Sequence, residues 1–352
     1  MSLSTLIESH CPFDTTLRRP YIIAEAGVNH EGDMELARRL VHEAAEGGAH
    51  AIKFQTYKAN TIASKDSPAY WDTSKEPTDS QYKLFKKYDK FWKAEFEQLK
   101  IYCQEAGIEF MSTPFDMESA NFLNELQDVF KISSSDITNK PFIGYLCDFG
   151  KPIILSTGAS YMHEIQQAVE WIDAKQIPVA LLHCILNYPT KDENAHLGMI
   201  KDLQRKFPAK IIGYSDHTLP NDMKVLEMAT LLGAVILEKH FTYDKTMPGN
   251  DHYHAMDKDD LKCFNHSLER VFTILGNQNK YPLPSETPAR NNARRSLVAA
   301  CEIPKGVTIT HDHLTWKRPA HGISPKEVES LLGKRASINI KEDQVLQWKL
   351  FD

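Results

Sequence analysis

Two lysines stand inside apolar stretches that have the composition of buried strands. Lys53 lies in AIKFQTY (51–57), and Lys131 lies in VFKISSS (129–135). An ammonium group in an apolar wall is costly unless a negative group meets it. Strand pairing does not neutralise two cations on separate strands, so the pattern predicts an anionic ligand that carries more than one charge.

Two other interpretations of these lysines stay open. Each ammonium group could pair with a carboxylate of the chain, such as Glu25 or Glu238. A lysine in this position could instead form a Schiff base with a carbonyl substrate. The anion is favoured by small hydroxyl side chains at other strand ends, which suit a phosphate or carboxylate. These are Thr113, Ser134, Ser156 and Ser215.

Two histidines follow the seventh and eighth strand-like stretches. His217 lies in GYSDHT and His240 in LEKHFT. Two imidazoles with carboxylates nearby suit a divalent metal that keeps positions open for water or substrate. The alternative is a pair of hydrogen-bonded histidines without a metal.

Strand-like and helix-like stretches alternate along the chain, which is typical of βα units and a parallel sheet. Between the first two strand-like stretches, a helix is predicted over 34–48, where Leu36, Leu40 and Ala44 fall on one face. Eight strands with helices over about 250 residues predict a TIM (β/α)8 barrel, whose strand ends meet at one rim. A doubly wound sheet is less favoured because no glycine-rich loop follows the first strand. The strands are predicted at 21–28, 51–57, 109–115, 129–135, 152–158, 179–185, 211–217 and 234–241.

Other segments depart from the barrel pattern. The connection 57–93 is long for a barrel loop and is interpreted either as a lid over the rim or as a surface excursion packed by its own aromatics. We predict a barrel domain over 1–276, a linker over 277–294 and a small β-rich domain over 295–352, where EIPKGVTIT and NIKEDQVLQ form two similar pieces.

The composition of the chain disfavours several classes of binding partner. The chain of 352 residues has 41 basic and 47 acidic residues, a net charge of −6, which disfavours nucleic acid and anionic membranes as partners. No apolar run is long enough to span a bilayer and the opening lacks a signal peptide pattern, so a cytoplasmic location is predicted. The six cysteines are scattered, which is typical of reduced thiols.

The motifs taken together, in order from about residue 20 to the end, resemble the sialic acid synthase family. They include IIAEAGVNHEGD, KFQTYK, STPFD, ILSTG, GYSDHT, LEKHFT, PGND and KRP. Each motif alone is weak, but the ordered set is specific. The resemblance implies a TIM barrel followed by an antifreeze-like SAF domain. It also implies condensation of phosphoenolpyruvate with an open-chain N-acylated hexosamine, such as N-acetylmannosamine or a 2,4-diacetamido-trideoxyhexose, with C–O cleavage and release of phosphate.

The same resemblance implies roles for particular residues. Lys53 and Lys131 would bind phosphoenolpyruvate, with Thr113, Ser134, Ser156 and Ser215 completing that pocket. His217 and His240 would hold Mn2+ or Mg2+, and Glu25 would act on the attacking water. Arg318 of KRP would enter the active site of a partner subunit, which implies a domain-swapped homodimer. The residues implied to face the sugar are Gln55, Asp136, Tyr188 and Asp251.

Some positions depart from the family pattern. Leu186 stands where neuraminate-making members carry asparagine, and Asp136 stands where many carry glutamate. These changes fall on the expected sugar side and leave the identity of the hexosamine open. Two other classes also remain: a metal- or lysine-dependent aldolase, and a carbohydrate-binding protein without catalysis.

Overall fold

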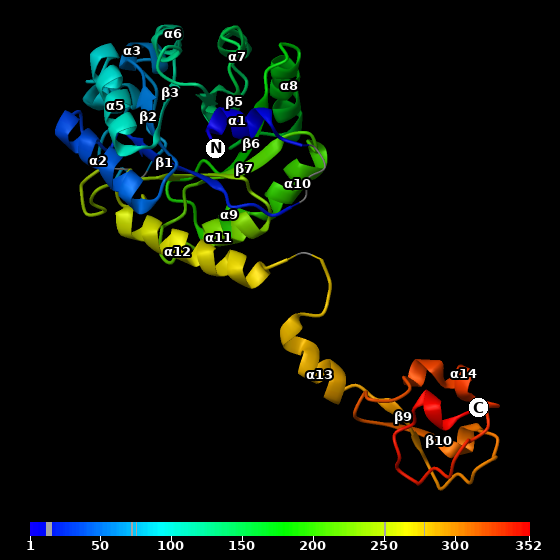
Figure 1. Ribbon diagram of the computed structural model, residues 1–352. Coiled ribbons are helices and arrows are strands. Elements are labelled where there is room, and N and C mark those ends of the chain that lie inside the picture. The colour runs from blue at the N-terminus through cyan, green and yellow to red at the C-terminus, as the bar shows by residue number, and fades with distance from the viewer. Residues whose placement is uncertain (12–15, 72, 75, 250, 278) are drawn as a thin grey trace. The chain divides into compact units, whose positions relative to one another are not determined.

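Eight parallel strands build the sheet of the first part of the chain (Figure 1). The computed structural model describes residues 1–11, 16–71, 73–74, 76–249, 251–277 and 279–352. The strands pair in the order β3-β2-β1-β8-β7-β6-β5-β4, and β3 and β4 also lie side by side, so the sheet closes into the predicted barrel. All eight predicted strands are confirmed. They are β1 (Tyr21–Gly27), β2 (Ala51–Thr56), β3 (Glu109–Pro114), β4 (Phe130–Ile132), β5 (Ile153–Ser156), β6 (Val179–Cys184), β7 (Ile211–Asp216) and β8 (Ile236–His240).

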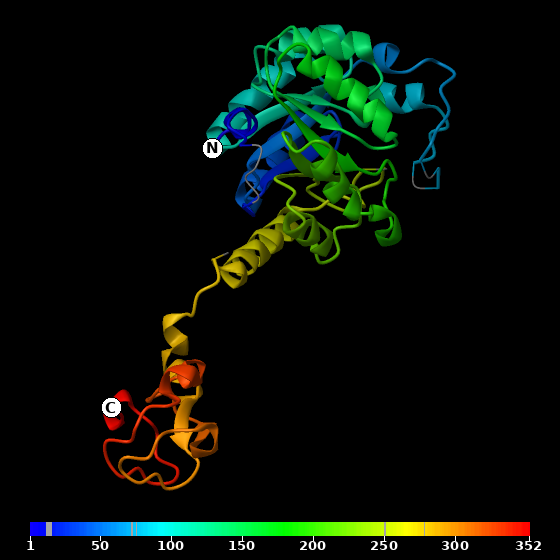
Figure 2. The same ribbon diagram turned by 90° about the vertical axis from the view of Figure 1, so that its right-hand side faces the viewer.

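Helices surround this barrel (Figures 1 and 2). The predicted helix after β1 is confirmed as α2 (Met34–Gly47): Asp33 accepts from the N–H groups of Glu35 and Leu36, and Gly48 ends the helix in the left-handed conformation at φ 91°. The other longer helices are α5 (Lys93–Ala106), α6 (Met117–Leu123), α7 (Lys140–Cys147), α8 (Met162–Asp173), α10 (Gly198–Lys206), α11 (Lys224–Leu231) and α12 (Lys258–Leu275). The shorter ones are α1 (Leu3–Glu8), α3 (Ala59–Ile62), α4 (Gln81–Tyr88) and α9 (Asp192–Ala195).

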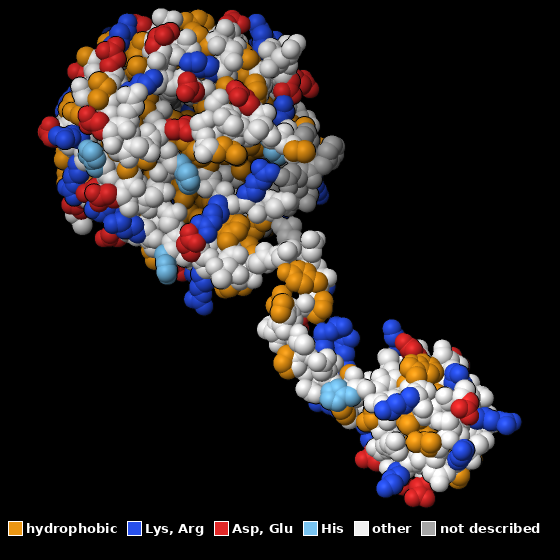
Figure 3. All heavy atoms as spheres, in the orientation of Figure 1, with side chains coloured by type: hydrophobic (Ala, Val, Ile, Leu, Met, Phe, Trp, Pro, Cys, Tyr) orange, Lys and Arg blue, Asp and Glu red, His pale blue; other side chains and the backbone are white. Residues whose placement is uncertain are grey.

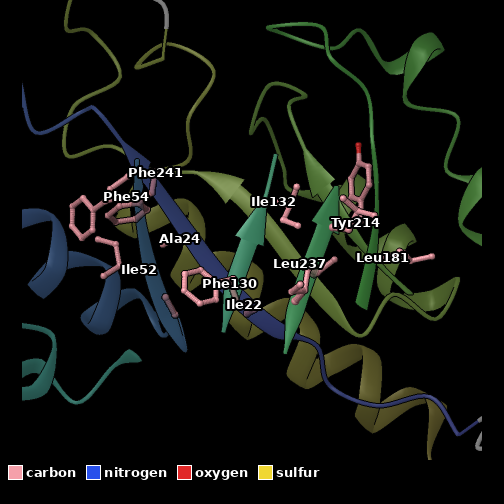
Figure 4. Packing of buried hydrophobic residues seen from close by; sticks show 14 of the residues in the cluster. Ile22, Ala24, Ile52, Phe54, Phe130, Ile132, Leu181, Tyr214, Leu237 and Phe241 are labelled. Atoms are coloured by element: carbon pink, nitrogen blue, oxygen red, sulfur yellow. The ribbon is translucent and has the colours of Figure 1, made fainter. Parts of the chain in front are cut away.

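Side chains alternate between the two faces of each strand, and this alternation separates two cores. Ile22, Ile52, Phe54 and Phe130 belong to the outer cluster, between strands and helices (Figure 4). The inner cluster takes the intervening residues at the amino ends of the strands, together with Leu3 and Ile7 of α1. Its strand residues are Tyr21, Ile23, Ala51, Met111, Val129, Ile154, Ala180, Leu182, Ile211 and Ile236. On most strands the next inward positions are polar, and they form the site described below.

The chain divides by its contacts into Met1–Ile274 and Leu275–Asp352. The second unit contains α13 (Thr287–Asn292), the antiparallel strands β9 (Ser296–Ala299) and β10 (Leu314–Lys317), and α14 (Val328–Leu331). A bridge joins Ile303 to Ile340, so the two similar sequence pieces pair with each other. This small β-rich unit has its own apolar core, which includes Leu297, Ile309 and Leu346.

Basic and acidic side chains are interspersed on the face of the molecule shown in Figure 3. Across the described ranges, no helix combines the length and the apolar character that crossing a membrane requires.

Gly213 of β7 occupies a position at which a side chain would point into the crowded interior of the barrel. A Cβ atom there would lie 2.4 Å from the backbone oxygen of Ile236 and 2.5 Å from Cδ2 of Leu182. We predict that Gly213→Ala lowers the free energy of unfolding by about 1–3 kcal/mol through overpacking. Thermal and urea unfolding measure the change.

Gly144→Ala in α7 is the matched control, because its Cβ would meet no atom within 4 Å. This variant is expected to be unchanged or more stable by about 0.5–1 kcal/mol, since alanine is the better helix former. Equal stability of Gly213→Ala and the wild type would contradict the packing described here.

Candidate active site

The carboxyl ends of the strands bring polar side chains into one hollow of about 400 Å³ inside the barrel mouth. Period-two alternation explains the strand residues of the set, because the residues that follow the inner apolar layer on a strand point inward as well. Ser134 and Tyr188 lie instead in the connections that follow β4 and β6. Eleven of the residues predicted from the sequence line this hollow. They are Glu25, Lys53, Gln55, Thr113, Lys131, Ser134, Ser156, Tyr188, Ser215, His217 and His240.

Two lysines and two glutamates form a buried charge cluster on the floor of this inner hollow. The Nζ atom of Lys53 lies 2.5 Å from Oε2 of Glu25 and 3.7 Å from Oε2 of Glu238. The Nζ atom of Lys131 lies 4.0 Å from Oε1 of Glu238, and it donates to the carbonyl oxygen of Ile132 at 3.1 Å. The cluster contains as many cations as anions, but Lys131 is paired less closely than Lys53.

Neutral donors hold the two carboxylates in place. Gln55 Nε2 donates to Glu25 at 3.2 Å, and the Ser215 hydroxyl donates to Glu238 at 3.1 Å. Lys53 also donates to the hydroxyl of Thr113 at 3.1 Å. The buried hydroxyl oxygen of Ser156 has no hydrogen-bond partner among the described residues. A buried polar atom without a partner is costly, and here it faces a space in which a ligand can satisfy it.

Burial shifts the acidity of the cluster. It raises the pKa of Glu25, although the neighbouring Lys53 opposes that shift. Burial also lowers the pKa of Lys131, with Glu238 opposing it. Burial lowers the pKa of Lys53 too, but Glu238 and Glu25 outweigh it and the net shift is upward. The two ammonium groups therefore differ in how strongly the site stabilises their protonated form. That form is favoured for Lys53 and disfavoured for Lys131.

Three imidazoles lie beside the charge cluster. The ring centroids of His217 and His240 are 5.4 Å apart, and those of His240 and His254 are 4.9 Å apart. Nδ1 of His217 donates to the carbonyl oxygen of Ile185 at 2.7 Å, which fixes the orientation of the ring. The buried Nδ1 of His240 has no hydrogen-bond partner among the described residues and lies 3.9 Å from Oδ2 of Asp251.

These groups fit a divalent cation. Ligand atoms of His240, Asp251 and His254 lie within 4.8 Å of one another. Burial lowers the pKa of His240 well below its usual range and that of His254 to about 3, so both rings are neutral, as metal ligands must be. Neither ring nitrogen of His254 has a hydrogen-bond partner in the described part of the chain. A metal would supply the missing partner of these nitrogens.

An outer pocket of about 770 Å³ adjoins the inner hollow, and Gln55, Tyr188 and His240 line both. The long connection 57–93 projects from one side of the barrel (Figure 2, blue to cyan) and contains α3 and α4. Its aromatic side chains, among them Tyr70 and Trp71, form much of the outer wall. The connection therefore contributes to the site, although whether it closes as a lid stays a prediction.

Three predicted residues lie outside the inner hollow. Asp251 lines the outer pocket instead. Asp136 lines neither space; it is in the turn after β4, where its carboxylate accepts from Asn139 at 2.9 Å. Arg318 is exposed on the second unit, directly after β10. The sugar contact of Asp136 and the intersubunit role of Arg318 stay predictions.

Sequence reasoning missed some residues of the site. Glu238 is predicted as a polar strand end and a possible lysine partner but not as a site residue, although its position two residues before His240 on the same strand face places it in the site. Cys184 lies two residues after the inward-facing Leu182 on β6, so it faces inward too. It lines the inner hollow together with Leu186. His254 lies in a loop without periodicity, and its place beside Asp251 in GNDHYHAMD indicates the sugar side of the site but not a metal ligand.

Comparisons with known proteins agree with this geometry. The model of the NeuB family matches residues 40–280, and that of the SAF domain matches residues 294–352. The chain is similar to the N,N'-diacetyllegionaminic acid synthase of Campylobacter jejuni, with 39% identity over 337 residues that cover 94% of this chain and 100% of the relative.

Two further relatives extend the comparison. The N-acetylneuraminate-9-phosphate synthase of Homo sapiens is 32% identical over 334 residues, covering 94% of this chain and 92% of the relative. The crystal structure of an N-acetylneuraminic acid synthetase from Leptospira borgpetersenii in complex with citrate superposes with a TM-score of 0.69. Its sequence is 36% identical, and the match covers 77% of this chain and 90% of that one.

Removal of the ammonium group of Lys53 tests the charge cluster. Lys53→Met deprives two buried carboxylates of their nearest shared cation, so we predict a loss of about 3–5 kcal/mol in the free energy of unfolding at about pH 8. Without Lys53 the pKa of Glu25 rises further above its usual value. A carboxyl whose pKa is raised in the folded state favours folding at low pH and loses that contribution as pH rises. The loss should therefore be smaller at about pH 5.

Urea unfolding at both pH values measures these losses. Lys83→Met is the control, because it removes an exposed ion pair with Asp79 at 2.8 Å, which is worth about 0–1 kcal/mol at either pH. The cluster described here is wrong if Lys53→Met costs no more than this control, or the same amount at both pH values.

Proposed function

The chain belongs to the NeuB family, and we propose that it is a nonulosonic acid synthase, a transferase that condenses phosphoenolpyruvate with an open-chain N-acylated hexosamine and releases phosphate. The observation that carries the proposal is the position of the lysine pair, Lys53 and Lys131, next to the imidazoles of His217 and His240 in a single hollow. A small anion that carries more than one negative charge would account for the lysine pair, and a divalent cation would account for the imidazoles.

Phosphoenolpyruvate would bind over the buried lysines. Its phosphate and carboxylate would take the ammonium groups of Lys53 and Lys131 as charge-assisted partners. The hydroxyl groups of Thr113, Ser134, Ser156 and Ser215 would supply further donors, and that of Ser156 is the one left without a partner. Lys131 gains most from the anion because its nearest carboxylate oxygen is 4.0 Å away.

His217 and His240 would hold Mn2+ or Mg2+, and Asp251 and His254 are near enough to His240 to complete the ligand set. A bound divalent cation supplies a Lewis acid that polarises the aldehyde oxygen of the sugar and orients it. The chain itself fixes the His217 ring through the carbonyl group of Ile185, and burial keeps His240 and His254 neutral.

The reaction forms one C–C bond and breaks one C–O bond. C3 of phosphoenolpyruvate attacks the aldehyde carbon of the sugar, the aldehyde oxygen gains a proton and becomes a hydroxyl group, and positive charge develops at C2. Water adds to C2 and loses a proton. The bond between C2 and the bridging oxygen then breaks, phosphate leaves with that oxygen and takes up a proton, and the C2 hydroxyl group loses its proton to become the ketone of a 2-keto acid. Positioning of both reactants in one hollow lowers the barrier.

Glu25 is suited to take the proton from that water. Its carboxylate is buried at the hollow, and burial already raises its pKa, which makes it a better base than an exposed glutamate. When the ligand anion competes for Lys53, the opposing effect of that lysine on the pKa of Glu25 weakens. The affinity of Glu25 for a proton therefore increases as phosphoenolpyruvate binds.

The sugar would occupy the outer pocket, with Gln55, Tyr188 and Asp251 contacting it. Gln55 and Tyr188 line both spaces, so they would lie where the two reactants meet. The proposal keeps two further expectations: that Asp136 faces the sugar, and that Arg318 completes the active site of a partner subunit in a domain-swapped homodimer.

One observation favours a second candidate, a lysine-dependent aldolase. Burial lowers the pKa of Lys131, and a lysine with a lowered pKa is the usual Schiff-base nucleophile. Such an enzyme would use the same barrel without releasing phosphate. Covalent trapping with borohydride and a carbonyl substrate distinguishes it.

The function is tested by phosphate release from phosphoenolpyruvate with Mn2+ and each of three sugars: N-acetylmannosamine, its 6-phosphate and a 2,4-diacetamido-trideoxyhexose. We expect release with at least one sugar, loss of activity with EDTA and recovery with Mn2+. With 18O in the bridging oxygen, the label should appear in the phosphate, because the C–O bond breaks. No release with any sugar, together with a borohydride adduct on Lys131, would favour the aldolase instead.

A further inference from the structure

A second buried ion pair lies on the outer face of the barrel, at the strand ends that carry two of the site histidines. Asp216 is the last residue of β7 and Lys239 is the last but one of β8, and the two are partners in the register of these strands. Nζ of Lys239 lies 2.6 Å from Oδ2 of Asp216, and both side chains are only 1% exposed. The residues that directly follow them are His217 and His240.

Strand alternation places this pair behind the wall of the inner hollow. Ser215 and Glu238, the residues just before the pair on each strand, line the hollow, so the pair points to the opposite face. Tyr214 and Leu237, two residues before the pair, belong to the outer cluster between strands and helices (Figure 4). The pair therefore acts on the site through the backbone of the two strands and not through contact with a ligand.

Hydrogen bonds from the pair extend across the backbone on both sides of His217. Oδ1 of Asp216 accepts from the N–H group of Thr218 at 2.9 Å and from the hydroxyl group of Tyr214 at 2.9 Å. Oδ2 accepts from the hydroxyl group of Thr218 at 3.0 Å. Lys239 donates to the carbonyl oxygen of Thr218 at 2.5 Å. A lysine of β8 thus binds the residues immediately before and after the histidine that follows β7.

Other backbone contacts hold each histidine separately. The carbonyl oxygen of His217 accepts from the N–H group of Thr190 at 2.8 Å, and that of His240 accepts from the N–H group of Met256 at 2.8 Å. Thr190 belongs to the connection after β6 and Met256 to the connection after β8. The ion pair adds a direct side-chain link between the two strand ends that carry these histidines.

Stability alone does not account for two charges at this place. Burial of an ion pair carries a desolvation penalty that its attraction can fail to repay, and a well-packed apolar pair is often as stable. An ion pair differs because its hydrogen bonds fix both distance and direction. Groups behind the ligands of a metal commonly have this task, since a metal site requires its ligands at set positions.

We propose that Asp216 and Lys239 are positioning residues that set the separation of His217 and His240 for a divalent cation. This inference rests on the proposed function, which places the cation at these histidines. The pair is neutral as a whole and faces away from the hollow, so its contribution is one of position and not of charge. Its removal should weaken metal binding while the chain stays folded.

The double variant Asp216→Asn with Lys239→Met removes both charges together. Asparagine keeps an acceptor for the N–H group of Thr218, methionine fills much of the volume of the lysine, and no buried charge is left unpaired. Mn2+ is titrated into the full-length wild type and the variant without substrates, and free Mn2+ is measured by electron paramagnetic resonance. We expect Kd for Mn2+ to increase about tenfold or more in the variant.

The control makes the same two substitutions at an exposed ion pair, Asp148→Asn with Lys175→Met, where the charged atoms are 2.9 Å apart. Both double variants leave the net charge of the chain unchanged, and the control should bind Mn2+ as the wild type does. Urea unfolding of each variant identifies a purely structural role. Such a role would lower the stability of the Asp216 and Lys239 variant but leave its Kd unchanged, because the folded form still dominates without urea.

The inference is overturned if the Asp216 and Lys239 variant binds Mn2+ as tightly as the wild type, or if the control is weakened equally. The proposed function then stands as long as the wild type binds Mn2+ and releases phosphate. Weaker binding in the Asp216 and Lys239 variant alone supports the inference even where no sugar gives phosphate. A wild type that binds no Mn2+ would overturn both the inference and the metal site of the proposed function.

Discussion

Four buried charges at the mouth of the barrel are the constraint on which the rest of the site depends. An isolated ion in this environment costs several kcal/mol, and two glutamates set against two lysines avoid that cost without a ligand. The pairing is unequal: Lys53 lies 2.5 Å from a carboxylate oxygen, whereas Lys131 is 4.0 Å from its nearest one. The pairing allows the chain to fold with these charges buried. It still leaves the ammonium group of Lys131 poorly compensated and facing the inner hollow. An anion is the partner that this arrangement lacks.

The barrel creates this situation through simple alternation. Tyr21, Ile23 and Glu25 point to the same side of β1, so an apolar layer at the amino end lies directly below a polar layer at the carboxyl end. The apolar layer lowers the local dielectric and makes each charge above it more sensitive to its neighbours. Burial shifts the pKa values of Glu25 and Lys131 in opposite directions, upward for the carboxyl and downward for the ammonium group. The apolar packing at the amino ends of the strands therefore influences the acidity of the charged groups at the carboxyl ends.

The sequence predicts the fold well because each strand is a short apolar run that ends in polar residues, and the barrel rule brings those ends together. The same rule predicts Lys53 and Lys131 in one site. The alternative partners named for the lysines, Glu25 and Glu238, are the ones that the structure shows. How closely each pair approaches is not predictable, because Glu25 and Glu238 are more than 200 positions apart in the chain and meet through the pairing of β1 with β8. Of the residues implied to face the sugar, Gln55, Tyr188 and Asp251 line the outer pocket, whereas Glu31, which also lines it, is not predicted there because it lies in a loop without periodicity. Asp136 shows the same limit: its position after β4 was clear, but its side chain turns to Asn139.

The most direct test is the affinity for phosphoenolpyruvate, in the absence of sugar, of the wild type and Lys131→Met, measured by calorimetric titration. If the poorly compensated ammonium group of Lys131 holds the anion, the variant should bind phosphoenolpyruvate about tenfold or more weakly, with an unchanged circular dichroism spectrum. Equal affinity of the two proteins would show that the buried charges are structural and that the anion binds elsewhere.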